Sequence, residues 1–118
     1  MKVMAGFPEP RADRHASAVL HDEANVRLIA FSLGPGQVIG THRSASTVLV
    51  HVVRGSGRFE GEAGAAELEA GGTAVYAPDE AHGMTAGADG LEFLAVLSPG
   101  PSMGRQGRLA GDAADGGT

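Results

Sequence analysis

The chain contains no cysteine and no tryptophan among its 118 residues. The lack of cysteine excludes disulfide bonds and thiolate metal ligands, and it leaves the redox compartment open. No apolar run approaches the roughly 20 residues that a membrane-spanning helix requires. The N-terminus carries one lysine and then breaks at Pro8. We therefore expect no signal peptide and a cytoplasmic protein.

Positive charge is also scarce. The chain has nine Lys and Arg residues and 14 Asp and Glu residues, which gives a net charge of -5. The basic residues are scattered singly, which argues against a nucleic-acid groove or an anionic membrane surface as partner. The length suits one domain. Only 42% of the residues are hydrophobic, and many of these are alanine. Such a shallow core would gain from burying more surface in a homodimer.

Helix-length periodic patterns are absent, whereas the 19 glycines and six prolines punctuate many short apolar stretches. Residues 48–53 are nearly all β-branched or aliphatic, which predicts a strand with both faces at least partly covered. The Gly55-Ser56-Gly57 sequence predicts a tight reversal into the next strand. Further strands are expected at residues 15–20, 26–33, 58–62, 66–70, 73–77 and 91–97. About nine or ten short strands predict an all-β antiparallel barrel or jelly roll.

The domain boundaries follow from composition. Residues 1–14 are rich in proline and charge and are expected to form an irregular lead-in. Residues 15–101 carry the strand pattern and should form the barrel domain. Residues 102–118 have almost nothing to bury, which predicts a flexible tail.

A first motif lies between Gly36 and Gly55. Gly36 is followed after five residues by His42, and Gly55 closes the stretch. This spacing resembles the first motif of the cupin family, which continues with a second histidine and a glutamate. Ser44 and Val48 occupy those two positions here.

A second motif begins at Gly72, which is followed after five residues by Pro78 and then by His82. It resembles the second cupin motif, although Glu80 stands where a turn glycine is usual and Ala86 where an asparagine is usual. Together the motifs resemble a small single-domain cupin of the cupin 2, quercetin-dioxygenase-like type. The resemblance implies a double-stranded β-helix, a jelly-roll barrel, with an incomplete metal-ligand set.

In a metal-bearing cupin the motif histidines point into the barrel, so the resemblance implies that His42 and His82 do so here. Imidazole ligands suit Fe, Mn, Ni or Zn, but two protein ligands are fewer than the three usual in a catalytic zinc site. A cavity with two polar anchors suits an organic ligand equally well. The other residues expected to line the cavity are Ser44, Val48, Val50, Tyr76, Met84 and Phe93.

Three other histidines are weaker candidates. His51 should point away from Val48, Val50 and Val52 because side chains alternate along a strand. His15 and His21 should face solvent or a partner subunit, unless residues 15–21 fold over the mouth of the barrel.

Three functions remain open at this point. The first, which we favour, is binding of a small molecule near His42 and His82. The second is a metal-dependent enzyme of the dioxygenase or isomerase kind that uses the same two histidines. The third is self-association or partner binding through residues 26–33 and the outer face that carries His51. Asp79 and Glu80 are interpreted as solvated loop residues.

Overall fold

The computed structural model describes residues 1–101, and the expected tail at 102–118 lies outside them. The described residues form an all-β structure, as the sequence predicted, and residues 1–15 contain no strand. The strands are β1 (Ala16–Glu23), β2 (Val26–Leu33), β3 (Val38–His42), β4 (Thr47–Gly61), β5 (Gly64–Glu69), β6 (Thr73–Tyr76) and β7 (His82–Ser98).

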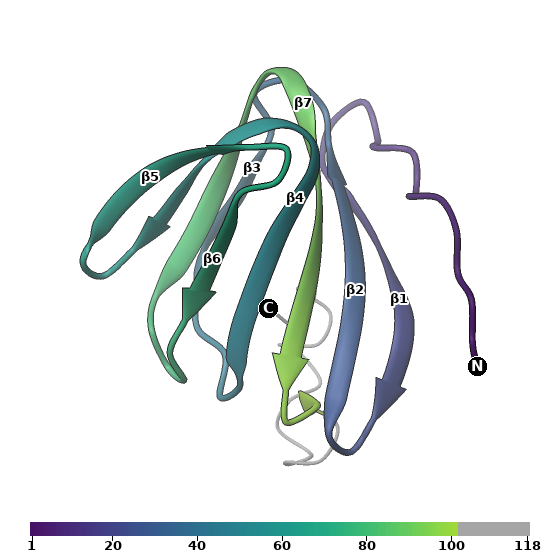
Figure 1. Ribbon diagram of the computed structural model, residues 1–118. Coiled ribbons are helices and arrows are strands. Elements are labelled where there is room, and N and C mark those ends of the chain that lie inside the picture. Colours follow the sequence, from purple (N-terminus) through teal and green to yellow (C-terminus); the bar gives the residue numbers. More distant parts are fainter. Residues whose placement is uncertain (102–118) are drawn as a thin grey trace.

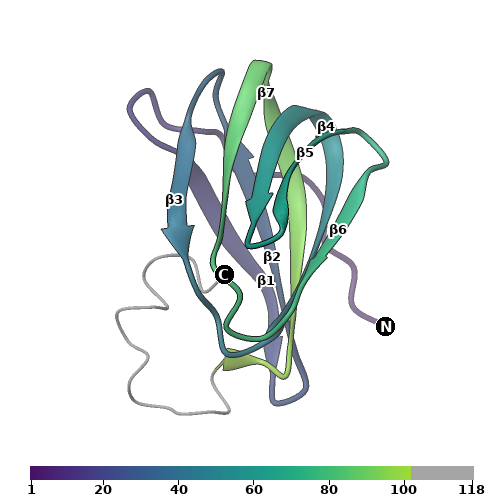
Figure 2. The same cartoon turned by 90° about the vertical axis from the view of Figure 1, so that its left-hand side faces the viewer.

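All the strand pairs are antiparallel, and their path runs β1-β2-β7-β4-β5, with β3 paired to β7 and β6 paired to β4. The two longest strands each serve two layers (Figures 1 and 2). The first half of β4 pairs with β6 and the second half of β7, while its second half pairs with β5 and the first half of β7. This arrangement folds the sheet over on itself into the expected jelly roll.

The predicted reversal at Gly55-Ser56-Gly57 is wrong, because these residues lie inside the single strand β4. The β4–β7 register shifts there, which marks a bulge. Gly55 has a φ of 79°, and a Cβ on it would overlap the backbone carbonyl of Gly90 on β7. A bulge and a tight turn both favour glycine. The glycines therefore do mark an irregular point in the backbone, but it is a bulge and not a turn. The described residues accordingly contain fewer and longer strands than expected.

The core lies between the two layers. Val48, Val50 and Val52 on β4 are fully buried, which confirms the alternation predicted for this strand. Phe31 on β2 and Phe93 on β7 stack at its centre with ring centroids 4.9 Å apart. The strand predicted over residues 26–33 is confirmed as β2. It lies between β1 and β7 in the sheet. Within the chain, β2 is therefore an interior strand, and β1 forms the edge.

No helix in residues 1–101 is long and apolar enough to cross a membrane.

Candidate functional site

His42 and His82 meet at one end of the barrel. His42 is the last residue of β3, His82 is the first residue of β7, and the two are register partners in the β3–β7 ladder. Their ring centroids lie 4.4 Å apart, with the planes inclined by 57°. The structure thus brings together the two histidines that the motif spacing singled out.

Backbone carbonyls fix the orientation of both rings. Nδ1 of His42 donates to the carbonyl oxygen of Gly40 at 2.8 Å, and Nδ1 of His82 donates to that of Glu80 at 2.9 Å. A carbonyl only accepts, so Nδ1 carries a proton in each ring, and the neutral ring of His82 presents Nε2 as an acceptor. His82 is only 1% exposed, and its Nε2 has no hydrogen-bond partner among residues 1–101.

The protonation of His82 is controlled by its burial. Burial lowers the pKa of His82, because an imidazolium would lose its hydration there. The hydrogen bond to Glu80 opposes this effect, and a charge on His42 would lower the pKa further. His82 is therefore held in its neutral form, with a buried acceptor atom.

Tyr76 also contacts His82. Its ring stacks on that of His82, with centroids 4.3 Å apart and planes 18° from parallel. Burial, followed by the charges of Glu80 and Glu60, raises the pKa of Tyr76 to about 12. The phenol is therefore neutral at ordinary pH, and its hydroxyl, like Nε2 of His82, lacks a partner within the described residues.

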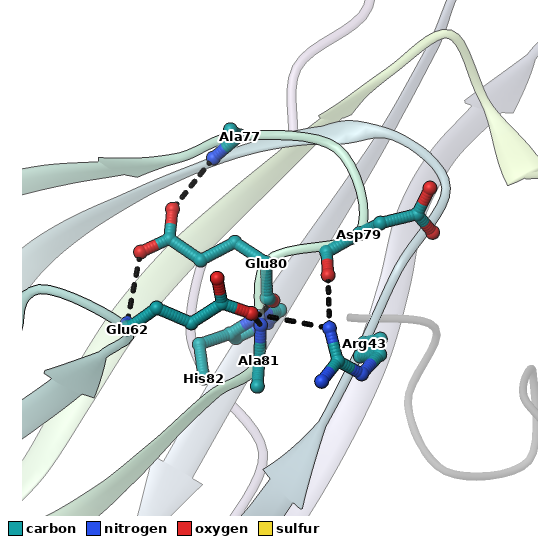
Figure 3. Close-up of polar contacts among 7 residues, drawn as sticks. All are labelled: Arg43, Glu62, Ala77, Asp79, Glu80, Ala81 and His82. Carbon is teal, nitrogen blue, oxygen red and sulfur yellow. Dashed lines mark hydrogen bonds and ion pairs between the residues drawn. The ribbon is translucent and has the colours of Figure 1, made fainter.

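The loop before His82 is held by Glu80 (Figure 3). Its Oε1 accepts a hydrogen bond from the backbone N–H of Ala77 at 2.9 Å, and its Oε2 accepts one from that of Glu62 at 3.1 Å. The side chain therefore closes its own loop and ties it to the end of β4. The interpretation of Glu80 as a merely solvated residue is wrong, because it fixes the backbone whose carbonyl orients His82.

Glu62 holds the same loop through a second set of contacts (Figure 3). Its Oε2 accepts from the backbone N–H of Ala81 at 2.9 Å and pairs with Arg43 at 3.1 Å. The hydrogen bond from Ala81 and the charge of Arg43 lower the pKa of Glu62. Arg43 also donates to the carbonyl oxygen of Asp79 at 2.5 Å. Asp79, rather than Glu80, takes the positive φ of the turn, at 65°.

Three pockets open around the histidine pair. One of about 450 Å³ is lined by His42 together with Arg11, Arg14, His15, Ala16, Ser17, Ile39, Gly40 and Thr41. A second, of about 490 Å³, is lined by His42, Ser44 and the loop around Asp79. The third, of about 360 Å³, is lined by His82 and by residues of β4, including Glu60. All three volumes suit small molecules.

The remaining residues expected to line a cavity lie deeper in the fold. Val48, Val50, Met84 and Phe93 belong to the packed core, and none of them lines the three pockets described above. Ser44 lines a pocket, and its Oγ accepts a hydrogen bond from the backbone N–H of Ser46 at 3.1 Å.

The three other histidines lie in three different environments. His51 lies on the outer face of β4, where its Nδ1 is 2.7 Å from Oγ1 of Thr73. His21 interacts with Lys2 and Glu23 on the surface. His15 alone reaches the mouth of the barrel, where it shares a pocket with His42.

The donor atoms at this end of the barrel do not form a metal site by themselves. The Nδ1 hydrogen bonds resemble those that orient metal-binding histidines. However, the described residues contain no group of three or more His, Cys, Asp or Glu residues placed to hold an ion. Val48 and Ser44 occupy the positions that would supply the missing ligands, and a valine cannot bind a metal.

Sequence reasoning overlooked the lead-in. Arg11 and Arg14 line the mouth beside His15, and the side chain of Gln37 donates to the backbone carbonyl of Arg11 at 2.8 Å. The Arg-Ala-Asp-Arg-His sequence immediately before the first strand was the available signal.

The folded-over antiparallel sheet and the histidine pair at its mouth define a cupin domain. The family model described as the AraC-like ligand binding domain matches residues 25–111. The chain therefore belongs to this family, and the resemblance to small cupins is confirmed. No curated protein sequence matches the chain.

Solved structures support the same fold. An RmlC-like cupin from Desulfovibrio desulfuricans is 20% identical, with a TM-score of 0.75 over 84% of this chain and 97% of that one. A protein with a double-stranded β-helix domain from Klebsiella pneumoniae is 23% identical, with a TM-score of 0.73 over 80% and 84%. A cupin superfamily protein from Desulfitobacterium hafniense is 15% identical, with a TM-score of 0.71 over 77% and 83%. At these identities the likeness shows the fold alone.

Proposed function

We propose that this cupin domain binds a small organic molecule at the mouth of the barrel and that His42 and His82 are its polar contacts. The observation that carries the proposal is the buried Nε2 of His82, an acceptor without a partner among residues 1–101. A buried polar atom left unpaired costs about 1–3 kcal/mol, so such an atom is expected to have a use. The ligand-binding family of the chain supports the same function.

The surrounding residues have supporting roles in this proposal. Tyr76 stacks on His82 and keeps that ring in place. Ser44 shapes the pocket next to His42. The core residues Val48, Val50, Met84 and Phe93 form the rigid apolar base beneath the histidines.

The test is a comparison of the protein with a His42→Ala/His82→Ala double variant in a thermal-shift screen of small organic molecules. Compounds that stabilise the wild-type protein should give no shift in the double variant. A His51→Ala variant, altered on the outer face, is the matched control and should respond as the wild type does. Stabilising compounds that act equally on all three proteins would contradict the proposal.

The metal content of the purified protein distinguishes this proposal from the metal-dependent alternative, which requires a bound ion. We expect protein purified without an affinity tag to contain far less than one equivalent of Fe, Mn, Ni or Zn, because only two ligands are present at the motif positions. We also expect a chelator to leave ligand binding unchanged. A stoichiometric metal that is lost together with ligand binding on chelation would favour the enzyme reading.

Self-association is a separate proposal, carried by apolar side chains on the outer face. Val53 on β4 and Val75 on β6 are 42% and 61% exposed, and this face also carries His51. We propose that a cytoplasmic homodimer covers it. Light scattering should show a dimer that a Val75→Glu substitution converts to a monomer, and a wild-type monomer at working concentration would contradict this.

A further inference from the structure

The pocket between the lead-in and β3 has an unusual charge for an acidic protein. Its titratable lining residues are Arg11, Arg14, His15 and His42, and no Asp or Glu lines it. Within residues 1–101, neither guanidinium forms an ion pair. In a chain with a net charge of -5, a pocket with two arginines and no carboxylate is unusual.

The basic segment is held in place by hydrogen bonds. The Gln37 amide donates to the backbone carbonyl of Arg11, and its Oε1 accepts from the N–H of Gly34 at 2.7 Å. The N–H of Arg11 donates to the carbonyl of Arg14 at 3.0 Å, which forms a local turn. The lead-in is thus attached to the β2–β3 loop, so both arginines are presented at the mouth rather than on a free end.

Arg11 and Arg14 place positive charge around this pocket. Burial, the charge of Arg14 and the charge of His42 all lower the pKa of His15. Like charges that face one concavity are relieved by an anion between them. The planar guanidinium matches the geometry of a carboxylate or phosphate group, with which it forms paired hydrogen bonds.

We propose that this pocket binds the oxyanion group of a small organic ligand, a carboxylate or a phosphate ester, through Arg11, Arg14 and the neighbouring histidines. The volume of about 450 Å³ accommodates a molecule larger than an inorganic ion. This inference rests on the proposed function, because it assigns a charge to the ligand that the mouth receives. His42 lines this pocket, and its ring contacts that of His82, so the pocket adjoins the histidine pair.

The experiment is an NMR titration with two charged probes and their neutral counterparts. Binding is monitored through the imidazole signals of the histidines. Glutarate is paired with glutaramide, and glycerol 1-phosphate with glycerol. We expect the anions to shift the signals of His15 and His42 in a saturable way, while the neutral molecules do not. His51, on the outer face, is the internal control. The tighter of the two anions identifies the class of oxyanion.

Substitutions test the role of the arginines. Arg14→Gln should weaken anion binding about fivefold, and an Arg11→Gln/Arg14→Gln double variant about tenfold or more, since each arginine supplies a charge-assisted contact. Arg54→Gln, which removes the same charge from an exposed site on β4, should leave affinity unchanged. Added salt should weaken the wild-type interaction.

The possible failures are distinguishable. Anions that bind no better than their neutral counterparts, or equally well to the double variant, would overturn the inference. Neutral molecules that still bind and lose binding in the His42→Ala variant would then leave the proposed function intact. No shift at His42 with any of the four probes would overturn the inference and count against the proposed function as well.

Discussion

His42 and His82 are register partners across the β3–β7 ladder, and their rings lie 4.4 Å apart at the mouth of the barrel. Burial lowers the pKa of His82, and a charge on His42 would lower it further. His82 is therefore held in its neutral form and offers Nε2 as an acceptor. This relationship leads to the first two predictions.

Replacing His82 with phenylalanine should abolish ligand binding and change the stability little. The ring can still stack on Tyr76, and the unpaired Nε2 disappears, which is worth about 1 kcal/mol in the free energy of unfolding. The hydrogen bond from Nδ1 to the carbonyl of Glu80 is lost as well, at a cost of about the same size. Urea denaturation measures the stability, and the thermal-shift screen measures the binding, with a His51→Phe variant that still binds as the control. A stability loss well beyond about 1 kcal/mol would mean that Nε2 has a partner that stabilises the fold.

Stability should fall as the pH is lowered through the ordinary histidine pKa of 6.5. The folded state resists protonation of His82, so the unfolded state binds more protons between 6.5 and the lower folded pKa. Stability is thus fully present above 6.5 and is lost below it, by at most about 1.4 kcal/mol per pH unit for each such group. Burial lowers the pKa of His15 as well, so it acts in the same direction.

A His82→Gln variant should show a shallower loss of stability than the wild type between about pH 7.5 and about pH 5.5. Urea denaturation at several pH values across this range gives the comparison. The control is His51→Gln, on the outer face. Parallel curves for wild type and His82→Gln would contradict the assignment of the pH dependence to His82.

Glu80→Ala should destabilise the protein by about 1–2 kcal/mol, because it removes two hydrogen bonds that hold the loop before His82. It should also broaden or shift the imidazole signal of His82, whose Nδ1 partner is the carbonyl of Glu80. Denaturation and NMR report the two effects. Glu69→Ala, at an exposed position on β5, should change neither, and an unchanged His82 signal in Glu80→Ala would argue against the positioning role.

Gly55→Ala should cost about 3 kcal/mol of stability, since it adds both a positive-φ penalty and an overlap with the carbonyl of Gly90. Gly36→Ala is the matched control, because Gly36 has a similar φ of 73° but open space around its Cα. We expect it to cost only about 1 kcal/mol. Equal losses in the two variants would mean that the close approach of β4 and β7 contributes nothing.

The strand pattern and the two motifs were sufficient to predict the cupin fold and the meeting of His42 and His82. The strand pattern follows from local alternation, which the sequence shows directly, whereas the meeting of the two histidines was implied by the resemblance of the motifs to those of cupins. The Gly55 bulge was misread because a turn and a bulge require the same backbone freedom. Only the carbonyl of Gly90, 35 residues further along the chain, distinguishes them.

The lead-in and the Glu80 loop could not be predicted for a different reason. Arg11 and Arg14 reach the mouth through the Gln37 amide, a contact that no periodic pattern records. Glu80 looked like an ordinary surface carboxylate, and its importance comes from the two backbone N–H groups that the fold happens to direct at it. Such roles belong to tertiary structure rather than to local sequence.

β7 is hydrogen-bonded to β2, β3 and β4, and His82 stands at its root. A side chain anchored in this way has little freedom to change its conformation. The geometry at the mouth of the barrel is therefore set before a ligand binds. Selectivity would then depend on a binding site that is already formed, without closure of a flap over the ligand. Binding would cost little conformational entropy.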